Sequence, residues 1–198
     1  LKYFTEFWCS DNTDPYERLY IQWSMSKFFP VKAMAAHVTH WNKQVDLKFS
    51  VDVASMCKLG FDIDYSKLSD EDKEFCRLAL VNYKRIKSTI LDGNQYRLVS
   101  PYESNHAAVA YVNAAQNHAV LFAYDLHPRY QEPVAKVKLQ GLAADKKYQL
   151  KEINLKQAKS SLNFDGKVYS GDFLMKVGLD ILSYQDGVSH VVELIAVQ

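Results

Sequence analysis

Near its start the chain gathers two carboxylates, two hydroxyls, an amide, a thiol and an indole within seven residues, 8–14. An apolar, extended-looking segment precedes this cluster, and Pro15 opens a helical pattern after it. Polar groups at the point where a strand gives way to a helix are typical of α/β active sites. Carboxyl groups there can act as general acids and bases, which makes Asp11 and Asp14 candidates. Turn formation and helix capping would account for the same residues, so spacing alone leaves both interpretations open.

The two carboxylates are three residues apart and are expected to differ in role. If a helix begins here, Asp14 points its carboxylate at the free N–H groups of the first turn. Asp11 stands before the helix and can project into a pocket at the carboxyl end of the preceding strand. Different surroundings give the two groups different pKa values, which is how one carboxyl stays available as an acid while its neighbour is structural.

Residues 1–93 must form the elements that position this cluster. Thr13 is the expected N-cap of the first helix, with Pro15 in its opening turn. We expect a strand over 31–38, a helix over 47–57 and a strand over 59–63. A longer helix begins at Ser69 and ends at Gly93. Its predicted buried face comprises Phe75, Leu78, Ala79, Asn82, Ile86 and Ile90. This alternation of strand and helix indicates a parallel α/β layer.

From residue 94 onward the apolar residues recur with a period of two. The predicted strands are 95–99, 107–113, 119–125, 134–139, 147–154, 167–169, 179–181 and 190–197. Turn-forming residues separate them, and one helical turn is expected over 170–178. Short strands at this spacing favour an antiparallel sandwich or Greek-key sheet, so residues 94–198 are expected to form an all-β domain.

Composition excludes several classes of function. The net charge is +1 over 198 residues, with acidic and basic residues interspersed, which predicts neither a nucleic-acid nor a membrane partner. No apolar run reaches about eighteen residues. The three cysteines lack the paired spacing of zinc or redox sites. His37 and His40 could share a helical face as metal ligands, but no third ligand stands nearby, so a structural or supporting role is favoured and no metal site is predicted.

Together with its neighbours, the opening cluster resembles a motif of the glycoside hydrolase family 36 α-galactosidases, the melibiase-like enzymes of clan D. Residues 6–19 are similar to that family's Trp-x-Ser-Asp-x-Thr-Asp-x-x-Glu-Arg stretch. The similarity continues in order through residues 29–38, 52–54 and 59–64, and then through residues 96–101, 141–154 and 169–179. Cys9 stands where many members carry Thr, and residues 40–44 replace a more usual Pro-Asn-His-Gln, which affects the expected leaving-group preference.

The resemblance implies a fold and a mechanism. Residues 1–93 would be the C-terminal part of a (β/α)8 TIM barrel, and residues 94–198 the antiparallel domain that follows it. Asp11 corresponds to the family's acid/base carboxyl, in a retaining mechanism without a cofactor. Trp8 is expected to contact the substrate, an α-galactoside oligosaccharide of the melibiose or raffinose type, while Asp14 and Arg18 support the site. Apart from the resemblance, Trp41, Asn42 and Gln44 could touch a sugar hydroxyl, and loop packing would account for the same residues.

The family's nucleophile lies in a Lys-Trp-Asp-type motif, which this sequence lacks. The resemblance implies that the family's galactose-binding stretch, of Cys-x-x-Gly type, also lies upstream of these residues. The chain also starts at Leu1, without Met. We therefore expect an internal piece of a longer enzyme that is inactive alone and that self-associates into a homo-oligomer through uncovered strand edges.

Two alternatives stay open: a non-catalytic carbohydrate-associated β-sandwich module, and a related activity such as α-N-acetylgalactosaminidase or galactosyl transfer. The compartment also stays open, between bacterial cytoplasm and periplasm.

Overall fold

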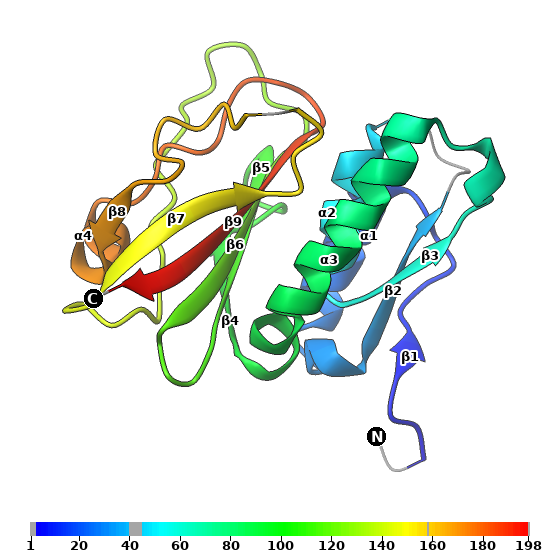
Figure 1. The fold of residues 1–198 in the computed structure, drawn as a ribbon, viewed down its shortest axis with the longest axis horizontal. Helices are drawn as coiled ribbons and strands as arrows, with labels where there is room; N and C mark the ends of the chain where they lie inside the picture. The colour runs from blue at the N-terminus through cyan, green and yellow to red at the C-terminus, as the bar shows by residue number, and fades with distance from the viewer. Residues whose placement is uncertain (1–2, 40–44, 158, 198) are drawn as a thin grey trace.

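The computed structural model describes residues 3–39, 45–157 and 159–197. It has three layers: a small parallel sheet, a layer of helices, and a larger antiparallel sheet (Figure 1). The strands are β1 (Phe7–Trp8), β2 (Met34–Thr39), β3 (Lys58–Asp62), β4 (Asn94–Val99), β5 (His106–Val112), β6 (His118–Asp125), β7 (Lys147–Ile153), β8 (Val168–Ser170) and β9 (Val188–Val197). The helices are α1 (Pro15–Met25), α2 (Leu47–Ser55), α3 (Asp70–Asp92) and α4 (Gly171–Lys176), with short 3-10 turns at Val31–Ala33 and Tyr65–Lys67.

The first sheet is parallel, in the order β1-β2-β3, as the alternation of strand and helix predicts. Side chains alternate along β2, so Met34, Ala36 and Val38 are buried toward the helices. His37 lies on the opposite face and is exposed. The strand predicted over 31–38 begins only at Met34, because Val31–Ala33 form a 3-10 turn directly after Pro30. One face of this sheet is therefore covered by helices, and the other is open.

The first helix begins one residue later than expected. Asp14, not Thr13, is the N-cap: its backbone is extended, and its carboxylate accepts a hydrogen bond from the N–H of Glu17 at 3.0 Å. Proline is favoured at the first helical position, where its missing N–H costs nothing, and this places the cap on the residue before Pro15.

The longest helix, α3, begins at the predicted cap. The Ser69 hydroxyl accepts a hydrogen bond from the N–H of Asp72 at 3.0 Å. Its buried face contains Phe75, Cys76, Ala79, Ile86, Thr89 and Ile90. Leu78 was wrongly assigned to this face: its side chain is 41% exposed, because position 78 is about a quarter turn away from the centre of the buried stripe.

The second sheet is antiparallel, in the order β4-β5-β6-β9-β7-β8. Every residue of β5 is buried because both faces of the sheet are covered. On one face Tyr111, Phe122 and Tyr124 share a core with α1, α2 and α3. On the other, Leu121 and Leu194 pack under irregular segments and α4.

Two predicted strands in this half, 134–139 and 179–181, are wrong. In the described residues these segments pair only at a single bridge between Val137 and Leu179. Gly141 and Gly178 have φ values of 77° and 83°, so the chain turns sharply beside each segment and cannot extend a ladder. Val137, Leu139, Leu179 and Ile181 are nevertheless buried on the sheet. The second half is thus sandwich-like, with an irregular second layer.

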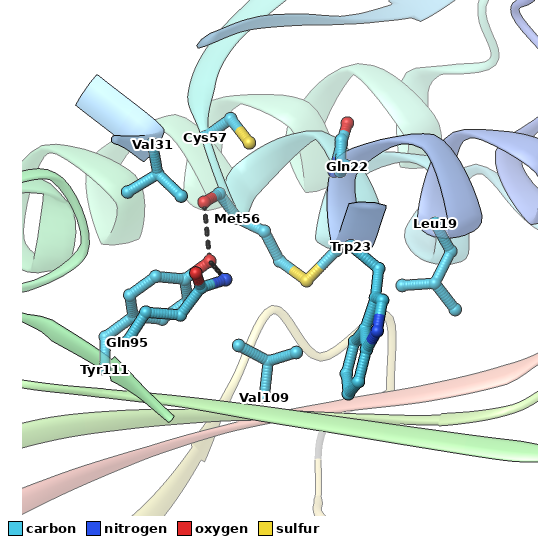
Figure 2. Close-up of a pocket in the computed structure, with 9 residues that line it drawn as sticks. All are labelled: Leu19, Gln22, Trp23, Val31, Met56, Cys57, Gln95, Val109 and Tyr111. Atoms are coloured by element: carbon cyan, nitrogen blue, oxygen red, sulfur yellow. Dashed lines mark hydrogen bonds between the residues drawn. The ribbon is translucent and has the colours of Figure 1, made fainter. Parts of the chain in front are cut away.

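A small cavity lies in the core that the helices share with the antiparallel sheet. Figure 2 shows the Tyr111 hydroxyl in this cavity, donating to the carbonyl of Met56 at 2.9 Å and accepting from Gln95 at 3.2 Å. The cavity volume is about 10 Å³, which is the size of one water molecule, so no sugar ring fits there. In the described ranges, no helix is long and apolar enough to cross a membrane.

Candidate functional site

An open hollow of about 580 Å³ lies on the uncovered face of the parallel sheet. It is lined by Glu6, Phe7, Trp8, Asp11, Thr13, Ala35, His37, Thr39 and Asp62. Thr39 and Asp62 are register partners at the carboxyl ends of β2 and β3, and Asp11 follows the carboxyl end of β1. Polar side chains from three parallel strands therefore converge at one end of the sheet, the end where α/β barrels carry their active sites.

The turn that carries Asp11 is held by hydrogen bonds within the turn itself. The N–H of Asn12 donates to the Ser10 hydroxyl at 3.1 Å, and the N–H of Asp14 donates to the Asn12 side-chain oxygen at 2.9 Å. Asp14 in turn binds the N–H of Glu17. The two aspartates therefore differ in surroundings: Asp14 caps α1, whereas the Asp11 side chain is exposed at the hollow.

Arg18 ties this turn to the neighbouring strand. It is 3% exposed and donates to the carbonyl oxygens of Ser10 at 2.9 Å and Ala35 at 3.4 Å. Its guanidinium carbon also lies 5.0 Å from the centre of the Trp8 ring. Burial lowers the pKa of Arg18, but an arginine titrates so high that it stays charged. Burial also raises the pKa of the Cys9 thiol, against the opposing charge of Arg18, so Cys9 stays neutral.

His37 packs directly on Trp8, with ring centres 3.7 Å apart and planes at 44°. Burial lowers the pKa of His37; the Asp62 carboxylate opposes this and the Arg18 charge adds to it. The net shift favours a neutral imidazole at pH 7. Neutral imidazole carries one donor and one acceptor nitrogen, so it can bind hydroxyl groups.

Trp8, Asp11, Asp14 and Arg18, which the sequence singles out, thus lie together around one strand–helix turn. Sequence reasoning missed Thr39 and Asp62 as lining residues. For His37 it favoured a structural or supporting role over metal binding, without placing the residue at the hollow. The signal for Thr39 and Asp62 was their position at the ends of two predicted strands. His40, Trp41, Asn42 and Gln44 lie outside the described residues. Within the described part of the chain, no three His, Cys, Asp or Glu side chains are grouped to hold a metal ion.

Comparison with known families accounts for nearly the whole chain. Residues 1–93 match the melibiase family model, and residues 106–194 match the model of the glycosyl hydrolase family 36 C-terminal domain. The chain belongs to glycoside hydrolase family 36.

Several family 36 proteins are similar over almost all of this chain. Alpha-galactosidase 1 of Pediococcus pentosaceus is 34% identical over 196 residues, covering 96% of this chain and 25% of the relative. The crystal structure of the α-galactosidase AgaB from Geobacillus stearothermophilus has a TM-score of 0.82 at 32% identity, covering 97% of this chain and 26% of AgaB. A variant of AgaA from the same organism, crystallised with raffinose, has a TM-score of 0.82 at 29% identity, covering 95% of this chain and 25% of AgaA. The chain spans about a quarter of the length of these relatives.

Proposed function

We propose that this chain supplies the acid/base carboxylate, Asp11, of a retaining α-galactosidase. The substrates are terminal, non-reducing α-D-galactosides of oligosaccharides of the melibiose and raffinose type. The observation that carries the proposal is the exposed Asp11 carboxyl on the turn after β1, at the rim of a hollow where three parallel strands end. The raffinose bound to the AgaA variant supports the substrate class.

In this proposal residues 1–93 form the C-terminal segment of a (β/α)8 barrel and residues 94–198 form a separate antiparallel domain. The parallel order of β1, β2 and β3 supports the barrel, as do helices on one face only and polar residues at the carboxyl ends. The open face would then be the barrel interior. In the isolated chain, no other strand of the described residues pairs with the outer edges of β1 and β3, which supports association between copies of the chain.

The proposed chemistry is a double displacement. A second carboxylate attacks the anomeric carbon of the galactosyl residue, while the Asp11 carboxylic acid donates its proton to the glycosidic oxygen as the bond to the leaving sugar breaks. Asp11, now a carboxylate, then takes a proton from water. The oxygen of that water attacks the anomeric carbon, which releases galactose and the second carboxylate and restores the acid form of Asp11.

The neighbouring residues have supporting roles in this scheme. Asp14 caps α1 and Arg18 holds the carbonyl of Ser10, so both fix the turn on either side of Asp11. Trp8 lines the hollow next to Asp11 and offers an indole face to a sugar ring. The nucleophile would come from outside these residues, because retaining enzymes need two carboxyl groups about 5–5.5 Å apart and the Lys-Trp-Asp-type motif is missing here.

The test replaces Asp11 by Asn in the full-length protein. A general acid contributes about 10²- to 10⁴-fold, so kcat on raffinose should fall by about that factor. Aryl α-galactosides carry good leaving groups that need little protonation, and their rate of bond cleavage should fall much less. The matched control is Asp70→Asn, whose exposed carboxyl at the start of α3 does not line the hollow; it should leave both rates unchanged.

Three outcomes would contradict the proposal. An equal loss for all leaving groups would mean that Asp11 only holds the substrate. Turnover of an aryl α-galactoside by the 198-residue chain alone would mean that the chain carries a complete site. A full-length sequence without a Lys-x-Asp strand motif would favour the non-catalytic β-sandwich module.

A further inference from the structure

Four residues from β1, α1, β2 and β3 form a continuous set of contacts beneath the Asp11 turn. Arg18 of α1 lies against Trp8 of β1, at 5.0 Å from the ring centre. Trp8 packs on His37 of β2, at 3.7 Å between ring centres. His37 in turn lies over Gly60 of β3, its register partner. The indole that immediately precedes the turn is thus supported from β2 and β3 as well as from α1.

Gly60 leaves the space that the imidazole occupies. A Cβ atom at position 60 would stand 2.6 Å from Cδ2 of His37 and 3.2 Å from its Nε2. The φ of Gly60 is not positive, so the backbone there is one that any residue adopts. Glycine at this position is therefore explained by the room it gives to the His37 ring.

His37 is not a core residue. It lies on the exposed face of β2. It lines the same hollow as Asp11 and Asp62. Its extensive contact is with Trp8, whose backbone leads into the turn that Arg18 holds through the Ser10 carbonyl. A displacement of the imidazole would therefore reach the turn through the indole.

We propose that His37 is a positioning residue for the acid/base turn, acting through Trp8, and that Gly60 provides the space this role needs. The proposal rests on the proposed function of Asp11. It assigns a role to a histidine that makes no proton transfer itself.

The test is Gly60→Ala in the full-length protein. To restore an ordinary contact of 3.4 Å, the His37 ring must move by about 1 Å. A displacement of that size at a reacting group costs up to about 100-fold, so kcat/KM on raffinose should fall by about 10- to 100-fold. The loss should be several-fold smaller for an aryl α-galactoside, because its bond breaks with little help from the acid.

A double variant separates positioning from general damage. If the added methyl group acts by pushing His37, then the double variant Gly60→Ala/His37→Ala should be as active as His37→Ala alone, because the methyl group then has no ring to displace. Gly166→Ala is the control: position 166 has a φ of 76° and nothing within 4 Å, so this change strains the backbone without touching the hollow. It should lower the melting temperature but leave the ratio of raffinose to aryl activity unchanged.

Three results would overturn the proposal: wild-type activity in Gly60→Ala, an equal loss on both substrates, or a double variant that is less active than His37→Ala alone. Circular dichroism and the melting temperature show whether each variant is folded. If Asp11→Asn has the expected dependence on the leaving group and Gly60→Ala does not, only the positioning role is wrong. If Asp11→Asn lacks that dependence, the proposed function is wrong as well.

Discussion

Asp11 and Asp14 have the same side chain but different surroundings. The first turn of a helix has N–H groups without intrahelical partners, and Asp14 stands where its carboxylate can accept one. Asp11 stands three residues earlier, with its side chain exposed at the hollow. At this scale, backbone geometry makes one carboxyl structural and leaves the other accessible to a ligand.

Removing the cap should cost stability. Asp14→Ala should lower the free energy of unfolding by about 1 kcal/mol, because the N–H of Glu17 loses its acceptor. Asp14→Asn should cost less, since asparagine caps helices about as well. Urea unfolding of the two variants measures the difference. Asp11→Ala is the matched control and should stay close to wild type; equal losses at both positions would contradict the capping role.

At the scale of elements, α2 is joined to the antiparallel sheet by a buried polar network. Asp52 is fully buried, and its carboxylate accepts from Lys48 at 2.6 Å, from Ser189 at 2.7 Å and from Asn154 at 2.8 Å. Lys48 also donates to the carbonyl of Ser189 at 2.6 Å. Because Ser189 lies on β9 and Asn154 directly follows β7, this network fixes α2 against both strands.

Breaking this network should be far more costly than breaking an exposed ion pair. Asp52→Ala leaves the ammonium of Lys48 without its buried partner, so the free energy of unfolding should fall by about 3–5 kcal/mol. The control is Asp172→Ala, which removes the exposed pair with Lys176 and should cost less than about 1 kcal/mol. Chemical denaturation would measure both. Similar losses in the two variants would show that the buried network does not fix α2.

At the scale of the whole molecule, histidine–carboxylate pairs link distant segments of the antiparallel half. His106 binds Asp125 at 2.8 Å, and His118 binds Glu193 at 2.9 Å. Glu193 also pairs with Arg85 of α3 at 2.6 Å. Burial acts to raise the pKa of Glu193, but the hydrogen bonds and charges of His118 and Arg85 outweigh it and lower the pKa to about 2.

This shift predicts how stability depends on pH. The folded pKa of Glu193 is below its ordinary value of 4.5, so the unfolded chain binds more protons between these limits. The stabilisation is complete above about pH 4.5 and is lost as the pH falls toward 2. Glu193→Gln should therefore lower the free energy of unfolding at pH 7 and flatten its slope over this window. Denaturation at several pH values tests this, with exposed Glu103→Gln as the control; an unchanged slope in Glu193→Gln would contradict it.

Much of this molecule follows from local sequence. The alternation of apolar runs, the cap at Ser69 and the motif around Asp11 are set by residues a few positions apart, and such patterns can be read directly. The predictions of a strand over 134–139 and of Thr13 as the N-cap are wrong because the local pattern fits two structures in each case. An apolar period of two at 134–139 is compatible with a buried irregular segment, and Thr13 and Asp14 are both good caps until the position of Pro15 decides between them.

By itself the sequence determined the family resemblance, the parallel and antiparallel halves, and Asp11 as the candidate acid. Only the tertiary structure decided which distant residues meet: the imidazole of His37 on Trp8 above Gly60, and Arg85 on Glu193, 108 positions away. The physical reason is that strand register and helix packing bring such pairs together. Strand register and helix packing are not encoded in the spacing of neighbouring residues, since both depend on how whole elements pack against one another.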